Sequence, residues 1–481
     1  MRRAKIVATL GPALDDRDKL RAAVEAGIDV VRLNFSHGDH ATHQRRLETV
    51  RELAERLNRN VGTLADLQGP KIRLGILPDE GVVLPTGGEV YLFPGAETLE
   101  VYQSEGIPAL PVVYEALGGD VEPGALVLIA DGTIRLVVSR LEDHGARVVA
   151  RVVAGGTAAS RKGVNLPGVA VSAPSMTDKD IEDLGAALGL GVDWVALSFV
   201  RSPEDMVSAR ERVHAAGAEA PIIAKLERPE VIDHLGEIID ASDAVMVARG
   251  DLGVEIGPER VPALQKEIIA QANMRAVPVI TATEMLESMV SSPRATRAEA
   301  SDVANAVFDG TDAVMLSGET AAGRYPVEAV RTMARIIEVA ESSPHLLHPS
   351  PQAPPGREIK RHVARAACQV AEDVAAAALV VFSITGDSIQ LVSKFRPKVP
   401  LVGLTPHEKT RLRTALMWGV EAALIPMKGA GSELISAAER FLVDGNWAQR
   451  GDPIVIVSGL PGGQGGTNRI VVHRIGEAIG G

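Results

Sequence analysis

The chain has 481 residues, 46% of them hydrophobic, a length that suits roughly three domains with substantial cores. Its formal net charge of -12 argues against nucleic acid or an anionic membrane as the main partner. No apolar run approaches the ~18 residues needed to cross a bilayer. A single cysteine, Cys368, excludes an internal disulfide framework and fits a reducing compartment, so we expect a cytoplasmic protein.

Eight apolar runs follow one another up to Leu316, and several of the segments between them carry helix signals. Ser202 and Pro203 offer a helix cap and a first-turn proline, and Thr296 with Glu299 fits a capping box. Strands that alternate with helices in this way predict a TIM (β/α)8 barrel. The eight runs are Lys5–Thr9, Val30–Phe35, Gly62–Leu67, Val192–Val200, Pro221–Leu226, Ala244–Ala248, Val277–Ala282 and Asp312–Leu316.

The interval between the third and fourth runs departs from this regular spacing. It contains short β-like pieces separated by turns such as Pro94-Gly95 and Pro123-Gly124. We therefore expect the barrel in residues 1–70 and 171–343, with a small β domain inserted as residues 71–170. An insertion after the third strand leaves the barrel at the carboxyl ends of its strands, where it can act as a lid over the active site.

The remainder of the chain predicts a third unit. Residues 344–356 are rich in proline and predict a stiff linker. Residues 357–481 again alternate helical segments with apolar runs, but these are too few for a second barrel. We therefore expect an α/β domain with an open sheet.

Polar side chains gather where the predicted barrel strands end, which is where the active site of a TIM barrel lies. Arg32 offers a planar fork for a phosphate, and Lys225 offers a compact charge for an oxygen that becomes negative during reaction. Glu227 and Asp251 are hard oxygen donors, which suit Mg²⁺ or Mn²⁺. The complete set is Arg32, Asn34, Ser36, Asp66, Lys225, Glu227, Arg249, Asp251, Thr283, Ser317 and Glu319.

Several ordered motifs contain these residues, and over its full length the chain resembles the pyruvate kinase family. The motifs are Arg32–Gly38, Asp66–Arg73, Ala224–Glu227, Ala248–Gly253, Met285–Met289 and Leu316–Thr320. The resemblance implies a barrel with an inserted β lid and a C-terminal α/β domain, assembled as a homotetramer. It also implies a phosphotransferase that uses Mg²⁺ to pass the phosphoryl group of phosphoenolpyruvate to ADP, giving pyruvate and ATP in the last step of glycolysis.

The resemblance implies a role for each residue of the site. Lys225 would stabilise the transferring phosphoryl group and the enolate oxygen, and Glu227 and Asp251 would bind the divalent cation. Gly250, Asp251 and Thr283 would hold the substrate carboxylate, and Thr283 would also lie near the proton path. Arg32 and Arg73 would contact the phosphoryl group, and ADP would contact Asn34, His37, Arg73 and Lys162. A monovalent cation would be bound by Asn34, Ser36, Asp66 and the Leu67 carbonyl.

The sequence departs from the family pattern at the monovalent-cation site. Lys71 stands where potassium-dependent members usually carry Glu, and an ammonium there can replace K⁺. Because Leu67, Gln68 and Leu74 agree with the potassium-independent pattern, we predict activity without K⁺. The alternative is that Lys71 is a solvated residue at the lid hinge and K⁺ still binds. Glu284, where Gln is usual, adds a carboxylate whose orientation the sequence leaves open.

A loop in the third domain resembles the family's sugar-phosphate effector loop. Its hydroxyls and glycine precede a helix, an arrangement that can hold a phosphate. Asp387 stands where a basic residue is common in members that respond to fructose 1,6-bisphosphate, so we expect a monophosphate effector, AMP or a hexose phosphate. The alternative is turn chemistry without a ligand. The expected ligand residues are Ser383, Thr385, Gly386 and Ser388.

Two other functions stay open at this point. A metal-dependent barrel aldolase acting on pyruvate enolates would share the Glu227 and Asp251 pair. It has less need of the lid or of Lys162, and coupling to ADP would separate the two activities. A regulatory protein that has lost catalysis is disfavoured by the intact set of Lys225, Glu227 and Asp251.

Overall fold

The computed structural model describes residues 2–104, 106–344, 358–426, 431–459 and 467–478. The predicted TIM barrel is confirmed as a closed ring of parallel strands in the order β1-β17-β16-β15-β14-β13-β3-β2. Every strand of the ring lies within one of the apolar runs of the sequence. The strands are β1 (Lys5–Thr9), β2 (Val30–Asn34), β3 (Gly62–Asp66), β13 (Trp194–Leu197), β14 (Ile222–Leu226), β15 (Ala244–Ala248), β16 (Val279–Ala282) and β17 (Ala313–Leu316).

Helices surround the barrel, and the sequence signals mark where two of them begin. Ser202 and Thr296 are the N-caps of α5 and α9, each in a capping box. The helices are α1 (Arg17–Ala26), α2 (His40–Arg56), α4 (Asp178–Gly189), α5 (Pro203–Ala215), α6 (Leu235–Ala241), α7 (Arg249–Ile256), α8 (Val261–Met274), α9 (Arg297–Asp309), α10 (Gly318–Ala321) and α11 (Pro326–Glu341), with 3-10 turns η1 (Pro12–Leu14), η3 (Pro229–Ile232) and η4 (Glu287–Val290).

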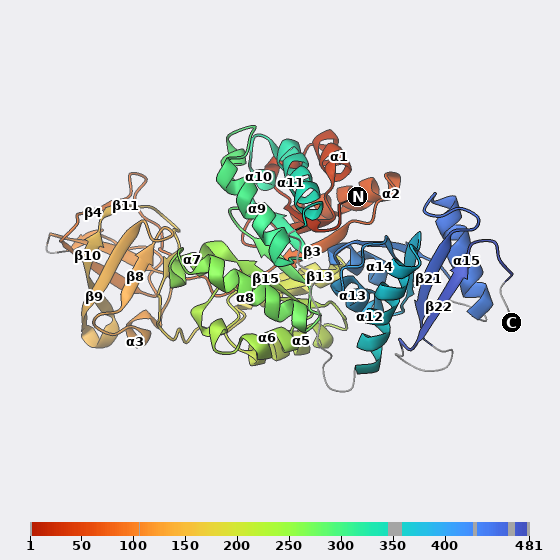
Figure 1. Cartoon of the computed structure of the whole chain (residues 1–481). Coiled ribbons are helices and arrows are strands. Elements are labelled where there is room, and N and C mark those ends of the chain that lie inside the picture. The colour runs from red at the N-terminus through yellow and green to blue at the C-terminus, as the bar shows by residue number, and fades with distance from the viewer. Residues whose placement is uncertain (1, 105, 345–357, 427–430, 460–466, 479–481) are drawn as a thin grey trace.

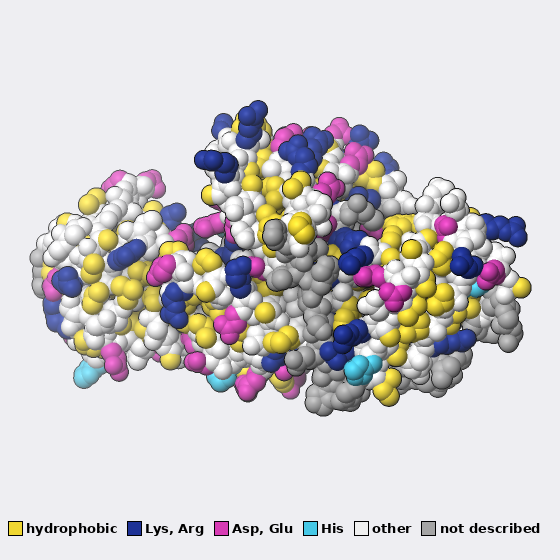
Figure 2. All heavy atoms as spheres, in the orientation of Figure 1, with side chains coloured by type: hydrophobic (Ala, Val, Ile, Leu, Met, Phe, Trp, Pro, Cys, Tyr) yellow, Lys and Arg dark blue, Asp and Glu magenta, His cyan; other side chains and the backbone are white. Residues whose placement is uncertain are grey.

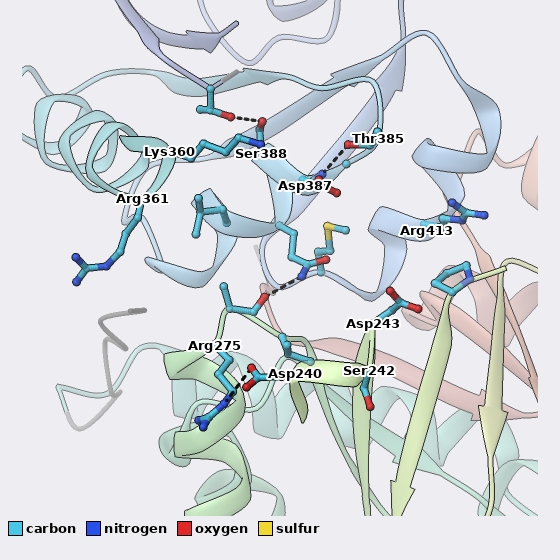
Figure 3. A pocket seen from close by; sticks show the side chains of 18 of the residues that line it. Asp240, Ser242, Asp243, Arg275, Lys360, Arg361, Thr385, Asp387, Ser388 and Arg413 are labelled. Atoms are coloured by element: carbon cyan, nitrogen blue, oxygen red, sulfur yellow. Dashed lines mark hydrogen bonds and ion pairs between the residues drawn. The ribbon is translucent and has the colours of Figure 1, made fainter. Parts of the chain in front are cut away.

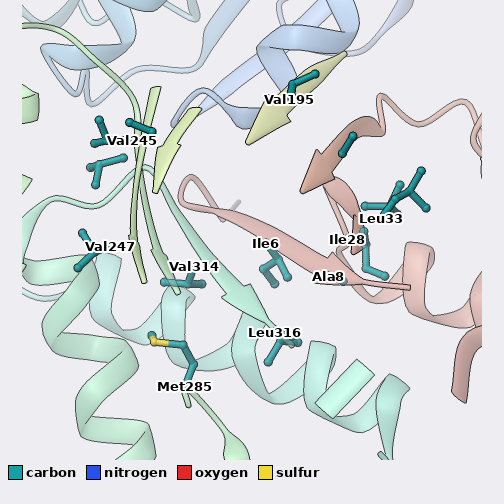
Figure 4. Packing of buried hydrophobic residues seen from close by; sticks show 14 of the residues in the cluster. Ile6, Ala8, Ile28, Leu33, Val195, Val245, Val247, Met285, Val314 and Leu316 are labelled. Carbon is teal, nitrogen blue, oxygen red and sulfur yellow. The ribbon is translucent and has the colours of Figure 1, made fainter. Parts of the chain in front are cut away.

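The barrel strands bury side chains on both of their faces. Because neighbouring residues of a strand point in opposite directions, Ile6 packs outward against the helices while Val7 fills the interior. Figure 4 shows the outer packing. Leu416 of the C-terminal domain joins the interior cluster and helps to close the amino-terminal end of the barrel. Each such fully buried Val, Leu or Ile contributes about 1.5–3 kcal/mol, which holds the strand ends in fixed positions.

The strands β4 to β12, between β3 and α4, form a separate β unit with its own core, at the left of Figure 1. Its sheets have the orders β12-β8-β9-β10-β5-β7-β6 and β11-β4. Its elements are β4 (Val82–Leu84), β5 (Glu89–Pro94), β6 (Gln103–Ser104), β7 (Ile107–Val112), α3 (Leu117–Asp120), β8 (Leu126–Ile129), β9 (Ile134–Glu142), η2 (Asp143–Gly145), β10 (Arg147–Ala154), β11 (Gly156–Ala158) and β12 (Val164–Asn165). We call this unit the insertion.

The C-terminal part is an α/β domain with an open sheet, as predicted, in the order β20-β19-β18-β21-β22. The edge strand β22 is antiparallel to β21, and the other pairings are parallel. Apart from residue 344, the predicted linker lies outside the described residues. The elements are α12 (Glu358–Asp373), β18 (Ala378–Phe382), α13 (Asp387–Lys394), β19 (Leu401–Thr405), α14 (Glu408–Arg413), η5 (Thr414–Leu416), β20 (Val420–Leu424), α15 (Gly431–Asp444), β21 (Pro453–Ser458) and β22 (Arg469–Arg474).

Charged side chains of both signs cover the visible face of the molecule. On the face drawn in Figure 2, acidic and basic side chains are interspersed over the insertion, the barrel and the C-terminal domain. Within the described residues, no helix has both the length and the apolar character that a membrane crossing needs.

Candidate active site

The end of strand β14 holds an ammonium group between two carboxylates. Lys225 Nζ lies 3.2 Å from an oxygen of Asp66 and 3.5 Å from an oxygen of Glu227, and it donates a hydrogen bond of 2.6 Å to Ser198 Oγ. Burial alone would lower the pKa of Lys225, but the two carboxylates outweigh it and raise that pKa. Lys225 is therefore a fixed positive charge that faces the carboxyl ends of the strands.

Asp66 joins this lysine to the arginine of the neighbouring strand. Its second carboxylate oxygen accepts a 2.6 Å hydrogen bond from Arg32 Nε, while Arg32 Nη1 donates to Thr9 Oγ1 at 2.9 Å. Burial would raise the pKa of Asp66, but the charges of Lys225 and Arg32 hold it below its usual value. The buried anion therefore aligns two cations on one side of the site.

Glu227 has one satisfied oxygen and one that is not. Its Oε1 accepts a 2.7 Å hydrogen bond from the backbone N–H of Phe199, whereas its Oε2 is buried and has no hydrogen-bond partner among the described residues. Burial raises the pKa of this carboxyl to about 7, although the ammonium of Lys225 opposes the shift. Oε2 makes no hydrogen bond and has Lys225 Nζ at 3.5 Å, so it keeps lone pairs suited to a divalent cation.

Asp251 lies in the first turn of α7 and pairs with Lys71, whose Nζ is 3.1 Å from Asp251 Oδ1. This places Lys71 in the site, but none of its described contacts is with the residues expected to hold a monovalent cation. Of those, Asn34 accepts from the backbone N–H of Ser36 at 3.1 Å, and the Leu67 carbonyl accepts from a serine hydroxyl at 2.7 Å.

The turn after β16 is strained. Thr283 and Glu284 have φ values of 70° and 54°, a region that residues other than glycine rarely adopt. Arg249 fixes this turn, because it donates hydrogen bonds to the Thr283 carbonyl at 2.7 Å and to Asp302 at 2.6 Å. Thr283 Oγ1 in turn accepts from the Gly250 N–H at 2.7 Å. Strained backbone that is held in place by hydrogen bonds from neighbouring residues is typical of functional sites.

Asp251, Thr283 and Glu284 face a cavity of about 1030 Å³ between the barrel and the insertion, whereas the cluster of Asp66, Lys225 and Glu227 does not line it. The insertion contributes Arg135 among others, and Glu284 is exposed in the lining, which answers the question that the sequence left open about its orientation. From the barrel the lining includes Lys71, Arg249, Gly250, Asp251, Thr283, Glu284 and Ser317, whereas buried Glu319 accepts the Ser317 N–H behind it.

The residues expected to contact ADP do not line this cavity. Asn34 and Arg73 are partly buried, and His37 and Lys162 are exposed. Burial lowers the pKa of His37, and the charges of Arg73, Arg32 and Lys71 lower it further. The histidine and these three cations therefore lie close enough to interact.

The expected effector loop lies elsewhere. Thr385, Gly386 and Ser388 line a second cavity of about 860 Å³, shown in Figure 3. Its barrel side includes Trp194, Pro221 and Val277, which stand where strands begin, so this cavity is at the end of the barrel opposite the active site. Loop hydroxyls also make internal contacts, because Ser383 accepts the Gly386 N–H and Ser388 bonds to Thr467.

Two further residues of the site, Ser198 and Phe199, were not predicted from the sequence. Ser198 contacts both Lys225 and the Leu67 carbonyl, and Phe199 supplies the N–H that binds Glu227. Both follow β13, so the strand-end rule used for the other strands would have found Ser198. Because the predicted run Val192–Val200 continues three residues beyond the end of β13, Ser198 does not stand at its end.

Comparison with known proteins agrees with this architecture. Residues 1–330 match the family model "Pyruvate kinase, barrel domain", and residues 361–473 match "Pyruvate kinase, alpha/beta domain". The chain is 46% identical to the pyruvate kinase of Mycobacterium intracellulare, over 99% of both chains, and 45% identical to pyruvate kinase 2 of Synechocystis sp., over 99% of this chain and 80% of that one. A solved pyruvate kinase from Cryptosporidium parvum superposes with a TM-score of 0.90 at 34% identity, covering 98% of this chain and 96% of that one. The chain therefore belongs to the pyruvate kinase family.

Proposed function

We propose that the enzyme uses Mg²⁺ or Mn²⁺ to transfer the phosphoryl group of phosphoenolpyruvate to ADP, giving pyruvate and ATP in the last step of glycolysis. The observation that carries the proposal is the ammonium of Lys225, held at the strand ends by Asp66, Glu227 and Ser198. Phosphoryl transfer depends more on positioning and charge neutralisation than on covalent chemistry, and a fixed buried cation contributes to both.

The donor set fits a divalent cation. Glu227 offers a buried oxygen without a hydrogen-bond partner, and Asp251 offers a partly exposed carboxylate on the adjacent strand-to-helix turn. A cation bound by these two residues would neutralise charge on the substrate oxygens. Binding requires both groups to be ionised, so it competes with the proton on Glu227.

Lys225 would stabilise the negative charge that develops on the enolate oxygen when the bond from that oxygen to phosphorus breaks. Arg32 and Arg73 would neutralise the phosphoryl oxygens. Asp66 fixes both cations in place, because its two oxygens lie 2.6 Å from Arg32 and 3.2 Å from Lys225.

Gly250 and Thr283 would hold the substrate carboxylate together with the metal ligand Asp251. In their present arrangement the Gly250 N–H is satisfied by the Thr283 hydroxyl, which donates to the Ala282 carbonyl. A substrate carboxylate offers an alternative acceptor for the N–H and leaves the hydroxyl close to the enolate, on the path of the proton that completes pyruvate. Asn34, His37 and Lys162 would contact ADP.

The proposal includes activity without K⁺. The only carboxylate of the expected monovalent-cation site, Asp66, is already neutralised by two cations. Lys71 adds another positive charge beside Asp251. These contacts support the view that a bound K⁺ adds little here.

We further propose that a monophosphate such as AMP or a hexose phosphate acts at the second cavity, in a cytoplasmic homotetramer. The lining of that cavity carries three carboxylates and four cationic side chains, which supports one phosphate better than two. The cations are Arg275, Lys360, Arg361 and Arg413, labelled in Figure 3.

The test is pyruvate formation from phosphoenolpyruvate, ADP and Mg²⁺ in Tris buffer, with and without K⁺, and with AMP or glucose 6-phosphate added. Equal rates with and without K⁺ are expected, with a chelator abolishing both. A requirement for K⁺ would contradict the role of Lys71 alone. A lack of pyruvate formation under every condition would contradict the proposed reaction.

A further inference from the structure

Helix α7 contacts both places where the chain passes between the barrel and the insertion. On the way in, Lys71 Nζ lies 3.1 Å from Asp251 Oδ1. On the way out, Asn165 Nδ2 donates to Glu255 Oε1 at 3.0 Å. Asp251 and Glu255 are four residues apart, so they lie on the same face of the helix. In Figure 1, α7 is the labelled barrel helix nearest to the insertion.

The two contacts differ in burial. The side chains of Lys71 and Asp251 are each 26% exposed, whereas that of Glu255 is 1% exposed. Arg228 also reaches the oxygen of Glu255 that Asn165 contacts, with Nη1 at 3.0 Å. The contact between Asn165 and Glu255 is therefore shielded from water and has a fixed geometry, while the one between Lys71 and Asp251 can exchange with solvent or with another cation.

The Glu255 carboxylate is held through only one of its two oxygens. Its Oε2 is buried and has no hydrogen-bond partner among the described residues. Its hydrogen bonds from Asn165 and Arg228 therefore both go to Oε1, and Arg228 supplies the opposite charge. Arg228 itself donates to the Val169 carbonyl of the returning chain at 3.3 Å, so both of these partners connect Glu255 to the exit from the insertion.

We propose that α7 couples the divalent-cation site to the position of the insertion, with Asn165 and Glu255 as positioning residues. The inference rests on the proposed role of Asp251 as a metal ligand. Because Asp251 and Glu255 are one helical turn apart, a displacement of α7 at one of them moves the other. Coupling between binding and position is reciprocal, so loss of the contact between Asn165 and Glu255 must also change the affinity for the cation.

The chain offers a matched control in Arg201. It donates to the carbonyls of Val171 and Ala173 at 2.6 and 2.9 Å, and so holds the same returning segment to the barrel. Its described contacts do not include α7. Arg201→Met therefore loosens the exit from the insertion without acting on the helix that carries Asp251.

The experiment measures Mn²⁺ binding by electron paramagnetic resonance, without substrates, and the distance between spin labels on the insertion and the barrel. Val83→Cys and Val207→Cys supply exposed labelling sites in a Cys368→Ala background. We expect Mn²⁺ to change the distance in the wild type. Asn165→Ala should weaken Mn²⁺ binding by roughly fivefold or more and abolish the change in distance. Arg201→Met should leave the Mn²⁺ affinity unaltered.

A conservative variant supplies a second test. Glu255→Gln keeps an oxygen that accepts from both Asn165 and Arg228, so it should preserve both readouts. Glu255→Met removes that acceptor and should lose both readouts, so the pair tests the coupling even where Asn165→Ala does not fold.

Three outcomes would overturn the coupling: unaltered Mn²⁺ affinity in Asn165→Ala or Glu255→Met, an equal loss in Arg201→Met, or loss of Mn²⁺ binding in Glu255→Gln. If instead Asp251→Asn leaves Mn²⁺ binding intact, the proposed metal site itself fails.

Discussion

Ser198→Ala is the variant that most sharply separates positioning from structure at the active site. In the folded enzyme Ser198 Oγ accepts a 2.6 Å hydrogen bond from Lys225 and donates one of 2.7 Å to the Leu67 carbonyl. The substitution removes both bonds with little change in volume. Lys225 keeps its charge but loses the partner that fixes its ammonium between the two carboxylates.

The magnitude follows from these contacts. A hydrogen bond to a charged group contributes about 1.5–3 kcal/mol, and each 1.4 kcal/mol corresponds to about tenfold in rate. Because Asp66 and Glu227 still hold Lys225 at 3.2 and 3.5 Å, we expect the lower end of this range. The value of kcat should fall about tenfold, with KM for phosphoenolpyruvate little changed. Loss of the donor to Leu67 should lower stability by about 1 kcal/mol.

The assay is steady-state pyruvate formation alongside thermal unfolding, with Ser202→Ala as the control. Ser202 caps α5 four residues further on, so its removal should lower stability by a similar amount, about 1 kcal/mol, without touching Lys225. An unchanged kcat in Ser198→Ala, or an equal fall in Ser202→Ala, would refute the reasoning.

Three further predictions follow from single groups. Because burial raises the pKa of Glu227 to about 7, Mn²⁺ affinity should weaken by about tenfold per pH unit below that value and stay constant above it, and a flat titration from about pH 6 to 8 would exclude Glu227 as a ligand. Burial lowers the pKa of Lys394, paired with Asp312, to about 8, so the unfolded chain holds more protons up to ~10.4 and the wild type gains stability as pH rises through this interval. The melting temperature of the wild type should therefore rise relative to Lys394→Met between about pH 8 and 10, and a constant difference would contradict this. Lys71→Glu should create a requirement for K⁺, seen as low activity in Tris that K⁺ restores, and equal rates would argue against Lys71 as the built-in cation.

The barrel could be predicted from the sequence because its strands are buried on both faces. Such strands read as continuous apolar runs, and β15, buried at every position, is the clearest case. The sheet order of the insertion could not be predicted, since β5 pairs with β10 and with β7 through contacts that no local pattern encodes. The edge strand β22 is not evident from the sequence, because its ends are arginines and its middle is only partly buried.

The active site was predictable to the extent that its residues follow strands. Lys225 and Glu227 could be found in this way, but their interaction with Asp66 depends on strands brought together by barrel closure. The contacts of α7 with Lys71 and Asn165 join segments far apart in the chain, so spacing carries no trace of them. The raised pKa of Glu227 likewise depends on burial, which exists only in the folded protein.

The central claim is that the charge of Lys225 stabilises the enolate and the phosphoryl group in flight. The most direct measurement is turnover of Lys225→Met with saturating phosphoenolpyruvate, ADP and Mg²⁺ at about pH 8, where Glu227 is ionised and Mn²⁺ binding can be checked in parallel. The account predicts a loss of at least ~10²–10³ in kcat while the divalent cation still binds. Turnover close to that of the wild type, with the cation bound, would contradict it.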